Sequence, residues 1–381
     1  MVRYIFLILV LLATLIPVTP PAEAASEASW NVTCTSSHWA PNDPIVFPNQ
    51  PGKSHLHTFY ANKTTDAATT TQSLLNSGPS TCTREFQDAD KSAYWIPALY
   101  KKSANGTLTE LKPAQPKDFS MTIYYRRAGG TTGPKVTAFP QGLRMIAGDP
   151  KATTPQDFVS FRCALTSDGG EQSKSNKDFA NCNSNESLMG DIKFPNCWDG
   201  KNLDSPDHKS HMAYHKKNVC PATHPVVVPQ VTMEPKWKNV NGPSSSFMLS
   251  SGGGYSFHAD FFSAWDPKVQ AALVNQCPNA GIKCNGKKLY TDIKPNFANV
   301  TDQQIKAQTA GAAYVPKVAS AATDHSNHQP APAPAAAAAP LPQTGPLTVF
   351  STVAGIGAMG YAYHAYRDRR RALRDSLRKR P

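Results

Sequence analysis

Two pairs of residues have the spacing at which side chains of an extended strand point to the same side. His55 and His57 form one pair, and His258 and Asp260 form the other. Residues i and i+2 of a strand lie about 7 Å apart on one face, close enough for both side chains to reach one ion. Imidazole nitrogens and carboxylate oxygens are ligands for zinc, copper, iron and manganese. Each pair is therefore a candidate pair of metal ligands.

A third pair has a spacing that suits a helical turn. His208 and His211 are three residues apart, and residues i and i+3 share one face of a helix. We expect the three pairs to converge on one transition metal ion, zinc or copper, with the five histidines as ligands. Asp207 or Asp260 would then act as the catalytic acid/base or as a further ligand. In the competing interpretation, each histidine only bonds a nearby backbone carbonyl.

Convergence imposes conditions on the elements that carry these residues. The strand with the first pair has to lie near the strand with His258. The loop after Trp198 then has to fold over both strands, held by Cys197 and Cys220. Neither H-E-x-x-H nor G-x-S-x-G occurs in the chain, so the sequence supports neither the usual metallopeptidase helix nor the nucleophile turn of α/β-hydrolases.

Alternating segments predict strands over 119–126, 158–163 and 255–261, the last with His258 and Asp260 on its polar face. Helices are predicted at Pro267–Gln276, where Asp266 is the N-cap, and after Thr301 or Asp302. The 33 prolines and 23 glycines argue against a helical bundle. We expect a β-rich fold (all-β or α+β), sandwich-like, with long loops and few short helices.

Eight cysteines lie between residues 34 and 284, and an even number in an exported chain predicts four disulfides, with the pairing left open. No C-x-x-C pair is present, which argues against a cysteine-ligated zinc site. Because cysteines mark both ends of this region, we expect one disulfide-stapled extracellular domain over residues 25–310. The cysteines are Cys34, Cys82, Cys163, Cys182, Cys197, Cys220, Cys277 and Cys284.

The N-terminus has the order of a secretory signal. Arg3 precedes a short apolar run, and Ala22-Glu23-Ala24 forms an A-x-A cleavage site. Residues 1–24 are therefore predicted to be a signal peptide that is removed after Ala24. The apolar run is too short to span a bilayer comfortably, which makes an N-terminal membrane anchor the weaker alternative.

The C-terminus resembles the L-P-x-T-G wall-sorting signal of bacterial surface proteins. An Ala/Pro-rich spacer (311–340) leads to the motif at 341–345, an apolar helix long enough to span a membrane (347–366) and a basic cytoplasmic tail (367–381). The resemblance implies that a sortase cleaves between Thr344 and Gly345 and transfers the chain to a cell-wall peptide. Without a sortase, the same helix would remain as a single-span membrane anchor. The motif residues are Leu341, Pro342, Thr344 and Gly345.

The net charge of +12 is concentrated in this tail. Residues 346–381 hold seven arginines and one lysine against two aspartates, which is half of the total. The remaining surface is only mildly basic and has no arginine stripe. Nucleic acid is therefore not expected as a partner.

Several blocks of the body are similar to a secreted family of domains of unknown function, number 1996, over about residues 34–285. The resemblance implies a polysaccharide setting, since members occur beside carbohydrate-binding modules, but it implies no reaction. Tyr214 is followed by His215 where the family pattern has a proline. The blocks are 51–62, 139–148, 194–214, 220–225 and 250–266.

Two function classes remain open. The first is a surface-anchored, metal-assisted hydrolase or lyase that acts on extracellular polysaccharide. The second is a non-catalytic carbohydrate-binding module or adhesin, in which aromatic rings would stack on sugars. The aromatic candidates are Trp95, Trp198, Tyr214 and Trp265.

The sorting signal makes a prediction about anchoring. Wild-type protein is expected in the envelope fraction, covalently linked to the wall. A Thr344→Ala variant removes the residue whose carbonyl the sortase attacks, and should lose the covalent linkage while remaining membrane-held. Fractionation with and without wall digestion measures both. Release of wild type and variant alike into the medium would contradict the sorting signal.

Overall fold

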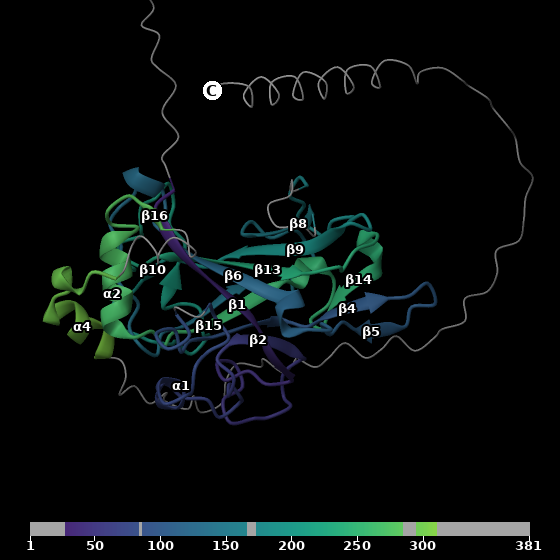
Figure 1. Cartoon of the computed structure of the whole chain (residues 1–381), viewed down its shortest axis with the longest axis horizontal. Coiled ribbons are helices and arrows are strands. Elements are labelled where there is room, and N and C mark those ends of the chain that lie inside the picture. Colours follow the sequence, from purple (N-terminus) through teal and green to yellow (C-terminus); the bar gives the residue numbers. More distant parts are fainter. Residues whose placement is uncertain (1–26, 84–85, 166–172, 285–294, 311–381) are drawn as a thin grey trace, which may run out of the picture. The chain divides into compact units, whose positions relative to one another are not determined.

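A computed structural model describes residues 27–83, 86–165, 173–284 and 295–310, and the regular secondary structure of this part of the chain is mostly β-strand (Figure 1). Its α-helices are short: α1 (Thr71–Leu75), α2 (Pro267–Gln276) and α4 (Asp302–Thr309). The predicted β-rich class is confirmed. Single 3₁₀ turns occur at Pro116–Asp118, Gly130–Thr132, Ser244–Ser246, Gly254–Ser256 and Phe297–Asn299.

The sorting elements cannot be compared with this structure. The predicted signal peptide, spacer, L-P-x-T-G motif, membrane helix and basic tail all lie outside the described residues. Within the described ranges, no helix has the length and apolarity needed to cross a membrane.

One ten-stranded sheet organises the described residues, and its strands are antiparallel except for the last, β16 (Lys283–Cys284), which pairs parallel to β1. The remaining order is β7 (Arg144–Gly148), β15 (His258–Phe262), β3 (Ala93–Pro97), β2 (His57–Ala61), β1 (Ser29–Ala40), β6 (Phe119–Arg126), β13 (Gln230–Trp237), β9 (Glu186–Lys193) and β8 (Val159–Leu165).

Two three-stranded sheets complete the described strands. The first has the order β14 (Phe247–Leu249), β4 (Leu99–Lys102) and β5 (Leu108–Glu110). The second is formed by the two-residue strands β11 (Met212–Ala213), β10 (Cys197–Trp198) and β12 (Val226–Val227). The second sheet therefore organises the long segment between β9 and β13, in which His208 and His211 lie.

Strand β1 belongs to both halves of the main sheet. Ser29–Thr35 pair with β6, and Ser36–Ala40 pair with β2, with a register shift between Ser36 and His38. A bulge of this kind bends a strand and increases its twist. The two halves consequently face each other across the core.

Aromatic contacts show how closely the two halves approach. The ring of Phe257, just before β15, lies 5.2 Å from Phe161 on β8 and 6.5 Å from Trp237 on β13, centroid to centroid. The β6 residues that face this core are buried at every second position, whereas the intervening ones are half-buried. The sheet is therefore curled over one main core, as the sandwich-like expectation requires.

The other face of the β2–β3–β15–β7 half carries a second, smaller apolar cluster. Phe59, Trp95 and Phe262 form its floor, and Ile45 and Leu74 cover it from the segments on either side of β2. All three floor residues are fully buried. This face of the sheet is consequently a second interior and not a solvent-exposed surface.

Most predicted elements are confirmed, with one correction. Helix α2 begins after Asp266, whose carboxylate accepts hydrogen bonds from the backbone of Lys268 and Val269. The predicted strand 255–261 is wrong at its start, because Gly254–Ser256 form a 3₁₀ turn and β15 begins only at His258. The polar face with His258 and Asp260 is buried beside the second apolar cluster.

All eight cysteines are paired, which confirms the four predicted disulfides. The cysteines pair consecutively along the chain, first with second, third with fourth and so on, so that no two disulfide-closed loops overlap. The pairs are Cys34–Cys82, Cys163–Cys182, Cys197–Cys220 and Cys277–Cys284.

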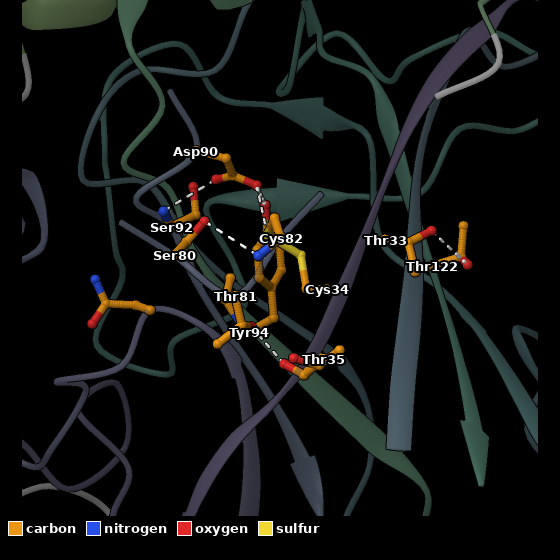
Figure 2. Close-up of a disulfide and its surroundings, with 12 residues drawn as sticks. Thr33, Cys34, Thr35, Ser80, Thr81, Cys82, Asp90, Ser92, Tyr94 and Thr122 are labelled. Carbon is orange, nitrogen blue, oxygen red and sulfur yellow. Dashed lines mark hydrogen bonds between the residues drawn. A yellow bond between two sulfur atoms is a disulfide. The ribbon is translucent and has the colours of Figure 1, made fainter. Parts of the chain in front are cut away.

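A chain of buried polar groups lies beside the first of these disulfides. Figure 2 shows Asp90 next to Cys82, with the hydroxyl of Tyr94 donating to Asp90 Oδ2 over 2.7 Å. The Tyr94 hydroxyl also bonds the hydroxyl of Tyr125, which accepts from Trp265 Nε1 over 3.0 Å. Burial raises the pKa of Asp90 to about 6, although hydrogen bonds from Tyr94 and Ser92 oppose the shift.

The raised pKa of Asp90 predicts a pH-dependent stability. A carboxyl group with a higher pKa in the folded state makes the free energy of unfolding fall as pH rises from about 4 to about 6. Asp90→Asn removes this titration, so its loss of stability between about pH 4 and about pH 7.5 should be smaller than that of wild type by about 2 kcal/mol. Urea unfolding in the presence of a chelator measures the difference.

Asp88→Asn is the matched control, because the Asp88 side chain is 73% exposed. It should follow the wild-type pH profile. Parallel profiles for wild type and Asp90→Asn would contradict the assignment of a raised pKa to Asp90.

Candidate metal centre

Three imidazoles and two carboxylates meet at the end of the sheet half formed by β2, β3, β15 and β7. One ligand atom from each of His55, His57 and His258 lies within 4.8 Å of the other two. Asp43, His57 and Asp260 form a second such group, so His57 is common to both. All five residues are buried.

The strand register explains why residues two hundred positions apart meet. His57 is paired with Pro97 on β3, and Asp260 is paired with Trp95 on the same strand. Continued by two residues, this register places His258 in one row with Pro97 and His57. Residues opposite each other in an antiparallel ladder share a face, so both imidazoles project from the same side of the sheet.

The ring centroids show the convergence directly. The centroid of His55 lies 4.2 Å from that of His57 and 4.9 Å from that of His258. Those of His57 and His258 are 5.8 Å apart. His55 itself precedes β2, in the coil that leads into the strand, and not in the extended strand expected from the sequence.

Backbone carbonyls determine the tautomers of two of these histidines. His57 Nδ1 lies 2.9 Å from the carbonyl oxygen of Asn42, and His258 Nδ1 lies 2.9 Å from that of Ser256. A carbonyl oxygen only accepts, so Nδ1 carries the proton in each ring. In a neutral imidazole this leaves the lone pair on Nε2, the arrangement that orients metal-ligating histidines.

The carboxyl groups of Asp43 and Asp260 are buried away from solvent. Burial and the charge of Asp43 raise the pKa of Asp260 well above its usual range, with Lys209 opposing the shift. Asp260 Oδ2 has no hydrogen-bond partner among the described residues. An ionised carboxylate in such surroundings is costly unless a cation compensates it.

Asp43 is held by its own turn. Its Oδ1 accepts hydrogen bonds from the backbone amides of Ile45 and Val46, each over 2.9 Å. Burial raises the pKa of Asp43 to about 6, although both bonds and the nearby His208 oppose the shift. No pattern in the sequence points to Asp43, because it belongs to no short-range pair and reaches the site only through the loop between β1 and β2.

The third predicted pair is divided by the structure. His208 lies beside the centre, close enough for its charge to act on Asp43, and its Nδ1 is 3.0 Å from Asp204 Oδ1. Burial opposes the charged form of His208, but the hydrogen bond to Asp204 raises its pKa overall. His208 is thus part of an ion pair at the edge of the centre and belongs to neither of the candidate ligand groups.

His211 has a structural position. Its Nε2 donates to the carbonyl oxygen of Arg144 on β7 over 2.6 Å, and its Nδ1 lies 2.9 Å from Ser205 Oγ. Both ring nitrogens therefore bond protein groups, and the bond to Arg144 fastens the loop after Trp198 to the sheet. His208 and His211 were expected to share one face of a helical turn. The segment that carries them is not helical, and the two rings have different partners.

Asp207 is also committed to this loop. Its Oδ1 accepts hydrogen bonds from the backbone amides of Lys209 and Ser210 and from the hydroxyl of Ser205. Burial raises its pKa, but these hydrogen bonds together lower it far below the usual range of an aspartate. A carboxyl group in this state holds no proton to donate at neutral pH.

The aromatic candidates also separate. Trp95 and Trp265 are fully buried and offer no face to a ligand from solution. Trp198 is half-buried, and its Nε1 donates to the carbonyl oxygen of Asn202 over 2.6 Å. Tyr214 is half-buried and stacks on Phe158 with 3.8 Å between ring centroids.

The centre fits a transition metal ion better than it fits a hard cation. Donor atoms around a tetrahedral zinc ion lie about 3.4 Å apart for bonds of about 2.05 Å, and the spread of up to 4.8 Å requires only small side-chain movements. Three imidazoles with one or two carboxylates suit zinc or copper, whereas calcium and magnesium prefer oxygen ligands alone.

Of three comparisons with known proteins, one gives a match, and the matched segment contains all five residues of the candidate centre. No curated protein and no solved structure matches the chain. A family model, described as domain of unknown function (DUF1996), matches residues 43–265, from Asp43 through Asp260. The match spans more than half of the chain, which therefore belongs to the DUF1996 family.

Proposed function

We propose that the domain is a metal-dependent enzyme, a hydrolase or lyase, that acts on polysaccharide outside the cell. The observation that carries the proposal is the buried convergence of three imidazoles and two carboxylates. Buried polar groups of this kind destabilise a fold unless they are paired, so their accumulation at one point favours a functional site.

The side chains divide into two roles. His55, His57 and His258 would hold the ion, and the carbonyls behind His57 and His258 keep the ligating nitrogens aimed at it. When bound, a zinc or copper ion supplies Lewis acidity at this position. Asp260 would complete the ligand set or move a proton, a role for which Asp207 is unsuited because it is hydrogen-bonded within its own turn.

The extracellular setting is supported by the four disulfides, which persist in oxidising compartments. Attachment to the cell surface through the L-P-x-T-G signal, with a sortase and a cell-wall peptide as partners, remains part of the proposal. The same signal with its apolar helix would otherwise keep the protein in the membrane.

The second candidate is a non-catalytic carbohydrate-binding module or adhesin. The stacked pair of Phe158 and Tyr214 favours it, because Phe158 is 36% exposed and its ring is available to a ligand. This candidate requires neither the metal nor a reaction, so metal content and turnover distinguish the two.

The first test is metal binding. The purified wild-type chain should take up about one equivalent of Zn²⁺ or Cu²⁺, measured by elemental analysis and titration calorimetry. His57→Ala removes the ligand common to both groups and should weaken binding by about 100-fold or more. His224→Ala is the control, because His224 bonds the Ser210 carbonyl on a surface loop away from the cluster.

Cooperative thermal unfolding of both variants has to be shown first, since His57 is fully buried. Wild type without bound metal, or a folded His57→Ala chain with unchanged affinity, would contradict the metal centre.

The second test is turnover. Metal-loaded protein should release new ends from a polysaccharide, as reducing ends in hydrolysis or as unsaturated, ultraviolet-absorbing ends in a lyase reaction. Asp260→Asn should lower the rate by about 10² to 10⁴, the usual contribution of a positioned acid or base, and Asp207→Asn should change it little. A metal-loaded chain that cleaves no extracellular polysaccharide but binds one would favour the second candidate.

A further inference from the structure

A cavity of about 260 Å³ opens next to the metal centre, on the far side of β15 from β3. Its walls come from the end of β7, the start of β8 and the loop around β11. Ile146 and Gly148 of β7 line it, and they are paired with Asp260 and His258 respectively. Since paired residues in an antiparallel ladder lie about 5 Å apart between Cα atoms, the cavity lies one strand away from the candidate ligands.

Gly148 lets β7 pass close to His258 at the edge of the cavity. Its φ is +79°, and a Cβ there would approach the Phe257 carbonyl oxygen to 2.6 Å and the His258 Cα to 3.0 Å. Only glycine allows β7 to pass so close to His258. The row of residues at the centre therefore ends at a position without a side chain, on the side of the cavity.

An aromatic platform forms one wall of the cavity. The rings of Phe158 and Tyr214 are stacked with their planes 3° apart. The Tyr214 hydroxyl donates to the carbonyl oxygen of Lys193 over 2.9 Å, and this bond holds the tyrosine ring in place beneath Phe158. Phe158, at 36% exposure, keeps its other face available. A flat, electron-rich face held in this way suits the C–H face of a pyranose ring.

The cavity is lined by both negatively and positively charged side chains. Asp149 and Asp157 supply carboxylates, and Lys209 supplies an ammonium group, which donates to the Gly148 carbonyl oxygen over 2.9 Å. Gln156 fixes the loop, since its amide bonds the carbonyls of Tyr255 and Phe257 and the backbone N–H of Asp149.

The two carboxylates outnumber the one ammonium group, which disfavours an anionic sugar. The hydroxyl groups of a neutral sugar can donate to Asp149 and Asp157 and accept from Lys209. We infer that the cavity is a binding subsite for a neutral pyranose unit of a polysaccharide chain, stacked on Phe158. The subsite lies beside the candidate metal centre, so the inference rests on the proposed function. Because a neutral sugar has no uronate carboxyl group to support elimination, the reaction of that site would be hydrolysis.

Binding of defined oligosaccharides to the purified full-length chain tests the subsite. The probes are cellohexaose, mannohexaose and maltohexaose as neutral chains, and hexagalacturonate as the anionic comparison, each measured by titration calorimetry. At least one neutral probe should bind, and Phe158→Ala should weaken it about tenfold through loss of the stacking face. Phe158→Trp should retain binding.

Phe297→Ala is the matched control, because Phe297 is another exposed phenylalanine, at 52%, and does not line the cavity. It should bind as wild type does. Both phenylalanines are at the surface, so neither substitution threatens the fold.

Metal content separates this inference from the proposed function. Phe158→Ala should keep its full complement of metal, and His57→Ala should keep its affinity for the neutral probe. Neutral binding that depends on Phe158 in a chain without metal would support the subsite and refute the metal enzyme. The subsite is refuted if no neutral probe binds more tightly than about 10 mM, if Phe158→Ala binds as wild type does, or if only hexagalacturonate binds.

Discussion

Strand β1 determines the geometry of everything around it. Its first half pairs with β6 and its second half with β2, and the register shift near Ser37 separates the two. Ser37 Oγ donates to the carbonyl oxygens of Phe59 and Asn62, which ties the bulge to β2. Because the strand bends there, the two halves of the sheet face each other across the main core. The outer face of the β2–β3–β15–β7 half packs against the loops on either side of β2.

The same strand also leads into one side of the candidate metal centre. Ala40 at its end is paired with His57, and the chain then turns through Asn42 and Asp43 before it returns as β2. Asn42 bonds His57 through its carbonyl, and Asp43 contributes its carboxylate. The loop that connects β1 and β2 therefore supplies both a candidate ligand and the carbonyl that orients another.

Local patterns in the sequence were sufficient for the β-rich class, the number of disulfides, strand β6 and helix α2, because alternation, cysteine number and capping act over short distances. Local patterns also singled out the pairs His55/His57 and His258/Asp260. His258 and Asp260 share one side of β15, whereas His55 approaches from the coil before β2. The structure brings these two pairs together. They were insufficient for His211, whose ring nitrogens are taken by Ser205 and Arg144, because the contacts of a loop residue depend on the element it lies against. Asp43 required knowledge of the strand order, which no short-range pattern contains.

The order of the disulfides bears on how the chain matures. The first cysteine of each pair bonds its immediate successor in the sequence. During the export proposed above, each bridge could therefore close before the following pair has crossed the membrane. A polypeptide exported from its N-terminus onward then meets the correct partner first at every step, and pairing errors that need reshuffling are avoided. The disulfides could thus form one after another from the N-terminus, with little need for a disulfide isomerase.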